Sequence, residues 1–212
     1  TQLAEFHQQH QPGIAAVGYM DAQGILQQYV GRDDPQGKAD VNFMPHVKRA
    51  LSTQGIVVSE GIVTSDGQYG IAIHVPLLIQ GKFQGDTVAT VRAENLALWV
   101  PQATDNPHTF TLVLDQSEHV VYHPNSQFLG ESIHATPKPI LNGAILAEGV
   151  LRDGRTGIVE GRLFGGKSHV LGVAAATVYG TRFLFLSGAS YDVIAAPALR
   201  FSRYTSILTG LT

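Results

Sequence analysis

The sequence contains no cysteine among its 212 residues. This absence excludes thiol nucleophiles, thiolate metal ligands and disulfide bonds. A protein without thiols has nothing to mispair in an oxidising compartment, so the absence slightly favours a location outside the cytoplasm. Many cytoplasmic proteins also lack cysteine, so composition alone leaves both compartments open.

Charged residues are also scarce. They make up 15% of the chain, the net charge is −3, and no run of Lys or Arg exceeds two residues. Nucleic-acid grooves and anionic membrane surfaces attract dense positive charge, so we expect neither as the main partner. Hydrophobic residues make up 44% of the chain, which is typical of a globular core and excludes disorder along most of it.

Long apolar runs are missing as well: none approaches the roughly 18 residues that span a bilayer, and no secretory signal opens the chain. The sequence starts at Thr1, and the helix predicted from residue 191 runs to 212 without a capping residue or a helix breaker. We therefore expect a processed chain or an excised fragment, with segment 191–212 leading toward a membrane segment.

Glycine- and aspartate-containing turns divide the chain into short elements. Each half contains two strands, a helical stretch and then antiparallel strands, which predicts an α+β fold and not a series of βαβ units. Predicted helices cover 1–11, 45–53, 94–100 and the segment from 191, and 56–63 is extended. The predicted strands are 14–20, 25–30, 69–79, 83–91, 110–114, 119–122, 157–164, 168–177 and 181–187.

The order of elements repeats after a polar stretch with two prolines at 101–107, which is the best domain boundary. Asp21 aligns with Asp115, 94 positions later, and Gly81 aligns with Gly180, 99 positions later. Two unrelated α/β segments remain the alternative to a repeat. The predicted division is the end of an N-terminal helix (1–11), a first module (12–100), a linker (101–107), a second module (108–190) and a C-terminal helix (191–212).

Residues 112–133 read LVLDQSEHVVYHPNSQFLGESI, an apolar strand followed by Asp115, a turn, Val120-Val121, His123-Pro124 and Gly130. This pattern resembles the opening of the membrane-proximal module in double Cache domains. These are the extracytoplasmic, PAS-like sensors of bacterial chemoreceptors, histidine kinases and cyclic-di-nucleotide enzymes. Segments 10–24 and 72–91 resemble the first hairpin and the Pro-containing strand of the membrane-distal module. The resemblance implies two tandem PAS-like modules, each an antiparallel sheet flanked by helices, with helical segments at the termini.

The sequence departs from the family where amino acids are bound. Cache modules of that kind resemble one another in an Arg before the pocket helix and an Asp in the last pocket strand, which pair with the ligand's carboxylate and ammonium. Met44 and Thr90 stand at these two positions. The resemblance therefore implies a small-molecule site without implying specificity for amino acids.

Candidate ligand-binding residues lie around the short helix and on the long strands of the first module. An arginine, together with Tyr69 or His74, would accept an anionic ligand. The alternative is that Tyr69 and Ile71 belong to the core and that Arg92 caps a turn. The candidates are Met44, His46, Arg49, Tyr69, Ile71, Ile73, His74, Thr90 and Arg92.

No arrangement of residues indicates catalysis. His7 and His10 could share a helix face, but neither has a third metal ligand nearby, so we expect both on the surface. The sequence contains no Gly-x-Ser-x-Gly elbow, and the glycines at 165–166 lack the spacing of a phosphate loop. We therefore expect no enzymatic activity in this chain, no cofactor and no metal.

The leading hypothesis is a small-molecule sensing domain on the periplasmic or extracellular face of the cytoplasmic membrane. It would belong to a membrane-anchored histidine kinase, chemoreceptor or diguanylate cyclase, with ligand bound in the distal module and a homodimer in the full-length receptor. One alternative is a ligand-free module that binds a partner protein or spaces the dimer. Another is a hydrolase, for which the sequence shows no convergent Ser/His/Asp cluster.

Overall fold

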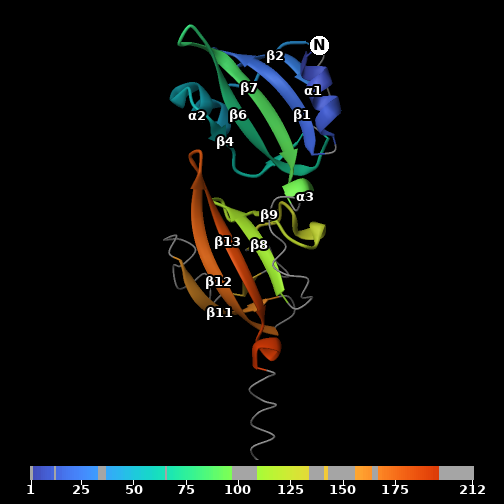
Figure 1. Cartoon of the computed structure of the whole chain (residues 1–212), viewed down its shortest axis with the longest axis vertical. Helices are drawn as coiled ribbons and strands as arrows, with labels where there is room; N and C mark the ends of the chain where they lie inside the picture. The colour runs from blue at the N-terminus through green and yellow to red at the C-terminus, as the bar shows by residue number, and fades with distance from the viewer. Residues whose placement is uncertain are drawn as a thin grey trace, which may run out of the picture.

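The structure is a computed structural model, and it describes residues 2–11, 13–32, 37–64, 66–96, 109–133, 141–142, 156–163 and 167–195. Two antiparallel sheets are stacked along the long axis of the molecule, one from each half of the chain (Figure 1). We call residues 2–96 the distal module and residues 109–195 the proximal module. The predicted α+β class with two antiparallel sheets is confirmed.

The distal sheet has the strand order β3-β2-β1-β7-β6-β4, and β5 also pairs with β6. Two helices cover its opposite faces: α1 (Gln2–His10) lies on one and α2 (Pro45–Thr53) on the other (Figure 1). The strands are β1 (Ile14–Asp21), β2 (Ile25–Val30), β3 (Ala39–Asp40), β4 (Val57–Val58), β5 (Ile62–Val63), β6 (Tyr69–Ile79) and β7 (Lys82–Arg92).

Local chemistry sets the ends of α2. Pro45 occupies the first turn, where its missing N–H has no helical partner to lose. Gln54 ends the helix with a left-handed φ of 48°, and its N–H donates to Ala50 O at 2.9 Å. The helix therefore begins and ends where the sequence predicted.

The proximal sheet has the strand order β10-β11-β12-β13-β8-β9. Its run β9-β8-β13-β12 matches the distal run β2-β1-β7-β6, so the repeated order of elements is present in the sheet topology. A short helix, α3 (Ala93–Leu96), lies between the two sheets (Figure 1). The strands are β8 (Thr109–Asp115), β9 (Val120–Tyr122), β10 (Leu141–Asn142), β11 (Gly157–Leu163), β12 (Lys167–Val178) and β13 (Thr181–Ser190), and η1 (Ser126–Phe128) is a 3-10 turn.

The long hairpins of the two modules close with the same kind of turn. Gln80 and Gly81 have φ values of 50° and 75°, and Tyr179 and Gly180 have 42° and 86°. Two consecutive left-handed residues are the signature of a two-residue hairpin loop whose twist matches that of the strands.

Buried side chains form two clusters. One lies inside the proximal module and the other lies at the junction, where residues of both modules pack together. We call the second the junction cluster. The proximal cluster contains Leu112, Leu114, Val120, Ile133, Leu171, Val173, Leu184 and Leu186. The junction cluster contains Val58, Ile71 and Val91 of the distal module and Val113, Val121, Tyr122 and Phe183 of the proximal module.

Some predictions differ from the structure or fall outside the described residues. The extended segment 56–63 is two short strands, β4 and β5, and β3 lies in a stretch predicted as loop. The linker 101–107 and the continuation of the C-terminal helix beyond residue 195 lie outside the described residues, so the domain boundaries stay predictions. Among the residues that the structure describes, no helix is both long and apolar enough to cross a bilayer.

Candidate ligand-binding site

A pair of histidines joins α2 to the distal sheet. His46 lies in the first turn of α2 and is 8% exposed, and His74 lies in the middle of β6 and is 1% exposed. His46 Nδ1 and His74 Nε2 are 2.8 Å apart and share a hydrogen bond. The alternation of side chains along β6 turns His74 toward α2, whereas Ile71 and Ile73 point to the other face.

Asp86 on β7 lies beside this pair and is fully buried, with 0% exposure. Its Oδ2 is 3.7 Å from His74 Nδ1. Among the described residues, neither Asp86 oxygen has a hydrogen-bond partner, and His74 Nδ1 has none. A carboxylate buried without a hydrogen-bond partner is costly, so Asp86 could accept a hydrogen bond from a ligand group at this part of the site.

Burial, together with the neighbouring His74, lowers the pKa of His46 from its usual 6.5 to about 4. Glu60 opposes this shift and Arg49 adds to it. His46 is therefore neutral at pH 7, and it can accept or donate a hydrogen bond without carrying charge.

Next to His74, the sheet face beneath α2 is formed by residues of β7 and β1. Thr90 and Val88 on β7 lie on the same face as His74, and neither is fully buried. Their partners on β1 are Ala16 and Gly18. Ala16 and Gly18 are buried, whereas Thr90 and Val88 stay partly exposed next to the histidine pair.

Met44 immediately precedes α2, is half-buried and has extended φ and ψ angles of −70° and 134°. Met44 therefore stands directly before α2 and Thr90 lies on β7, and their equivalence to the family's Arg and Asp positions stays a prediction. By the sequence resemblance, a thioether and a hydroxyl stand where amino-acid-binding Cache modules have a guanidinium and a carboxylate. Neither group pairs with a charged ligand as those groups do.

The two predicted arginines are engaged in ion pairs. Arg49 Nη1 is 2.9 Å from Glu60 Oε1, and Arg49 Nη2 donates to Val58 O at 3.1 Å and to Thr181 Oγ1 at 3.0 Å. Burial acts to raise the pKa of the Glu60 carboxyl, but hydrogen bonds from Arg49 and the backbone, together with the charges of Arg49 and His46, lower it overall. Because Thr181 belongs to β13, Arg49 reaches from α2 across to the proximal module.

Arg92 lies at the far end of β7, and its Nη2 is 2.7 Å from Asp66 Oδ2. Burial would raise the pKa of Asp66, but hydrogen bonds from Thr64 and Arg92 lower it. Arg92 thus fixes the turn before β6, which agrees with the alternative role considered from the sequence.

Tyr69, Ile71 and Ile73 lie on the opposite face of β6 and pack in or against the junction cluster. Burial raises the pKa of Tyr69 strongly, and the charge of Asp115 and a hydrogen bond to it add to the shift. A Cβ on Gly61 would lie 1.9 Å from the Tyr69 hydroxyl oxygen, so only glycine fits there.

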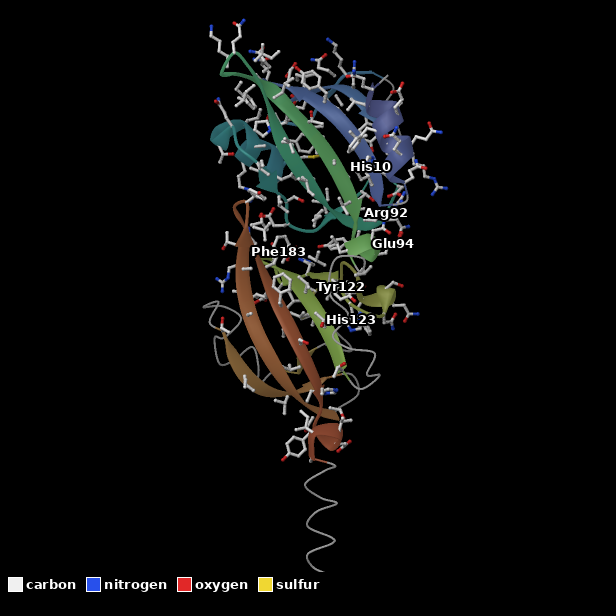
Figure 2. The ribbon with its side chains drawn as sticks, in the orientation of Figure 1. His10, Arg92, Glu94, Tyr122, His123 and Phe183 are labelled. Carbon is white, nitrogen blue, oxygen red and sulfur yellow. The ribbon has the colours of Figure 1, made fainter. Side chains whose placement is uncertain are left out.

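Asp115 receives donors from both modules. Its Oδ1 accepts from Ser117 N at 2.9 Å and from His119 N at 3.0 Å, and its Oδ2 accepts from Gly61 N at 2.8 Å. Arg92 and Glu94 lie at the lower end of the distal module, with Tyr122 and Phe183 across the junction from them (Figure 2). The junction is both packed and hydrogen-bonded, so it connects the modules firmly.

The nine predicted site residues therefore divide into three groups. His74 and Thr90 lie on the sheet face beneath α2, with His46 in the first turn of that helix and Met44 immediately before it. Tyr69, Ile71 and Ile73 lie at the junction, and Arg49 and Arg92 form ion pairs.

Among the residues that the structure describes, cavities also lie away from α2. One of about 430 Å³ opens at the junction, and one of about 660 Å³ lies between α1 and the outer sheet face. The first is lined by Val63, Gly67, Gln68, Tyr69, Glu94, Ser126, Leu129, Gly130 and Glu131, and the second by Gln2, Leu3, Phe6, Val17, Gln28 and Thr87.

Sequence reasoning missed Asp86 and misjudged His7. Only the two-residue alternation from Thr90 could have placed Asp86 on the His74 face. His7 was expected on the surface, but it is buried and its Nε2 lies 3.1 Å from Ala15 O. Its packing against β1 could not be inferred from helix spacing alone.

No protein-family profile matches the sequence, and no curated protein matches it. Several solved structures do match it. The extracellular ligand-binding receptor from Desulfohalobium retbaense DSM5692 has a TM-score of 0.62 at 17% identity, covering 88% of this chain and 32% of that one. This chain therefore spans about a third of that receptor's length.

The ligand-binding domain of the Pseudomonas aeruginosa PAO1 amino acid chemoreceptor PctB, in complex with L-Arg, has a TM-score of 0.62 at 15% identity, covering 91% of this chain and 80% of that one. An extracellular domain assigned to the histidine kinase rpHK1S-Z16 has a TM-score of 0.66 at 17% identity, with coverages of 91% and 77%. These matches show that the chain has the double, PAS-like Cache fold of extracellular sensor domains.

Proposed function

We propose that this chain is the extracytoplasmic sensing domain of a membrane-bound signalling receptor, and that a small molecule binds its distal module between α2 and β7. Solved structures of the same fold include ligand-binding domains of chemoreceptors and an extracellular histidine kinase domain. The chain would therefore act by binding and not by catalysis.

The observation that carries the distal location is a difference between the two sheets. The face beneath α2 holds half-buried Thr90 and Val88 beside the unpartnered carboxylate of Asp86. The described part of the proximal module instead buries Leu112, Leu114 and other apolar residues in a continuous cluster. Ligand sites combine apolar walls with a few convergent polar groups, and half-buried Val88 beside His46, His74, Asp86 and Thr90 supports a site of this kind.

The polar groups of this face favour an uncharged or hydrogen-bond-donating ligand over a free α-amino acid. Met44 and Thr90 offer no countercharge to an amino acid zwitterion. An anionic ligand would have to displace Glu60 from Arg49 or Asp66 from Arg92. Neither exchange is favourable without a second compensating charge.

A thermal-shift screen at pH 7.5 tests the proposal, with sugars, polyols, amines, purines, organic acids, L-amino acids and GABA as probes. We expect stabilisation by one uncharged or amine class, since a ligand that binds only the folded state raises Tm. Organic acids and amino acids are expected to give no shift. A shift with L-amino acids alone would contradict the ligand class, and no shift with any class would favour the ligand-free spacing module.

Thr90→Phe supplies the control for location, because the added ring would fill the face beneath α2. Thr177→Phe is the matched change on an exposed position of the proximal strand β12. We expect Thr90→Phe to abolish the ligand shift and Thr177→Phe to preserve it. The reverse result would place the site in the proximal module.

A further inference from the structure

The pair of His46 and His74 joins helix α2 to strand β6, two elements that are far apart in the sequence. Residues 46 and 74 lie 28 positions apart, one on the helix and the other on the central strand. Their 2.8 Å contact is the side-chain hydrogen bond that ties the first turn of α2 to the sheet. Its strength therefore affects how firmly the helix is held.

Two nitrogen atoms 2.8 Å apart accommodate one hydrogen between them. A neutral imidazole has one donor and one acceptor nitrogen, and an imidazolium has two donors. The bond forms when at most one of the two rings is charged. When both rings are protonated, the facing N–H groups repel each other and the contact must open.

Asp86 makes the arrangement asymmetric. It is the charged group that faces His74, from β7, at 3.7 Å from Nδ1. Asp86 thus lies on the His74 side of the pair, whereas the charged groups that act on His46 are Arg49 on α2 itself and Glu60 after β4. Repulsion between two protonated rings would therefore act on His46, in the first turn of the helix.

We propose that His46, His74 and Asp86 form an acid-sensitive latch, in which uptake of a second proton releases the first turn of α2 from the sheet. The distances and burial of the three groups carry this inference, and the depressed pKa of His46 agrees with it. The latch itself does not depend on a ligand. Its use in signalling rests on the proposed function, because α2 is then the helix that covers the ligand site.

Release of α2 would also reach the junction. Arg49 lies three residues after His46 and bonds to Thr181 of the proximal module at 3.0 Å. The same helix therefore contacts the latch at one end and the proximal hairpin one turn later. Acidification would therefore weaken the His46–His74 contact and, through α2, the Arg49–Thr181 contact.

Hydrogen exchange of the full chain between pH 4 and pH 6.5 tests the latch, with rates corrected for the intrinsic pH dependence. We expect the opening constant of the α2 amides to rise about tenfold per pH unit as the pH falls through this range, since one proton is taken up on opening. Amides of Leu112 and Leu114 on β8, in the proximal core, serve as the internal reference. A flat α2 opening constant would overturn the proposal.

His46→Gln keeps a hydrogen-bonding side chain but removes the titration, so we expect its α2 opening constant to be independent of pH. His10→Gln is the matched control, because His10 is exposed on α1, and it should keep the wild-type slope. A slope retained in His46→Gln would assign the effect to another group.

Imidazole ¹⁵N spectra of the wild-type protein provide a readout that needs no variant. We expect protonation of His46 to coincide with shifts of the α2 amide resonances. Protonation of His46 without any change in α2 would overturn the latch even if His46→Gln failed to fold. The metabolite screen at pH 7.5 is independent of both results, so failure of the ligand proposal and failure of the latch are distinguishable.

Discussion

The two modules use the same aspartate turn for different purposes. In the distal module, Asp21 Oδ1 accepts from Gln23 N and Ile25 N, both at 3.0 Å. In the proximal module, Asp115 Oδ1 accepts from the amides two and four residues on, at 2.9 and 3.0 Å. This side-chain turn is local chemistry, so both copies have it.

The second oxygen separates the two copies. Asp21 Oδ2 accepts from Gln27 on the neighbouring strand, whereas Asp115 Oδ2 accepts from Gly61 N of the other module. Asp115 also holds the hydroxyl of Tyr69 and is 0% exposed. The same turn can therefore link the two modules when its second carboxylate oxygen accepts a hydrogen bond from the other module.

Replacing the two aspartates gives the largest expected difference. Asp115→Ala removes acceptors from buried donors in both modules, and we expect a loss of about 3 kcal/mol in the free energy of unfolding. Asp21→Ala removes a turn acceptor on a less buried residue and should cost about 1 kcal/mol. Urea unfolding measures both. Equal losses in the free energy of unfolding would show that the bonds of Asp115 to the distal module do not contribute to stability.

Tyr69→Phe tests the junction bond alone. Removing the hydroxyl should cost about 1–1.5 kcal/mol, because Asp115 keeps its three amide donors. Tyr179→Phe is the control, since Tyr179 is 57% exposed, and its effect should be within about 0.5 kcal/mol of zero.

The same bond predicts a loss of stability in alkali. The pKa of Tyr69 is raised in the folded state, so the unfolded chain releases this proton first as pH rises. The stabilisation is complete below about pH 10, the usual tyrosine value, and declines above it. Chemical unfolding between pH 9 and 11 should show a steeper decline in the wild type than in Tyr69→Phe. Identical slopes would contradict it.

The Arg49–Thr181 contact tests coupling between α2 and the proximal hairpin. A double-mutant cycle with Arg49→Gln and Thr181→Val should give an interaction energy of about 1 kcal/mol or less, because Arg49 is partly exposed. Arg92→Gln with Thr181→Val should be additive, since Arg92 pairs with Asp66 instead. An additive first cycle would show that the contact carries no coupling.

The smallest expected effect lies in the turn itself. Gly24 and Glu118 both have positive φ, 84° and 62°, so the proximal copy has a side chain where the distal copy has glycine. Glu118→Gly should stabilise the protein by about 0.5 kcal/mol by relieving the left-handed conformation. Glu118→Ala removes the same charge but keeps the Cβ, so it should not. A gain in both would assign the effect to charge.

Local features were predictable from the sequence because their causes are local. Pro45, the Asp21 turn and the two-residue turn at Gln80 fix the ends of α2 and of the long strands. The site required information between distant segments. Arg49 bonds to Thr181 across 132 positions. Asp86 is buried between β1 and β6, and residue spacing does not show that these strands flank it.

The hairpin of β12 and β13 has one further consequence. Its turn bonds to the distal module through Tyr179 O and Thr181 Oγ1, and its strands run without interruption to residue 190. Ten paired residues at about 3.3 Å each make a strut of about 33 Å whose length is fixed by the backbone. A strut cannot absorb displacement by stretching, so any movement of the turn beneath α2 must reappear at its other end, where the chain enters the helical segment after residue 190.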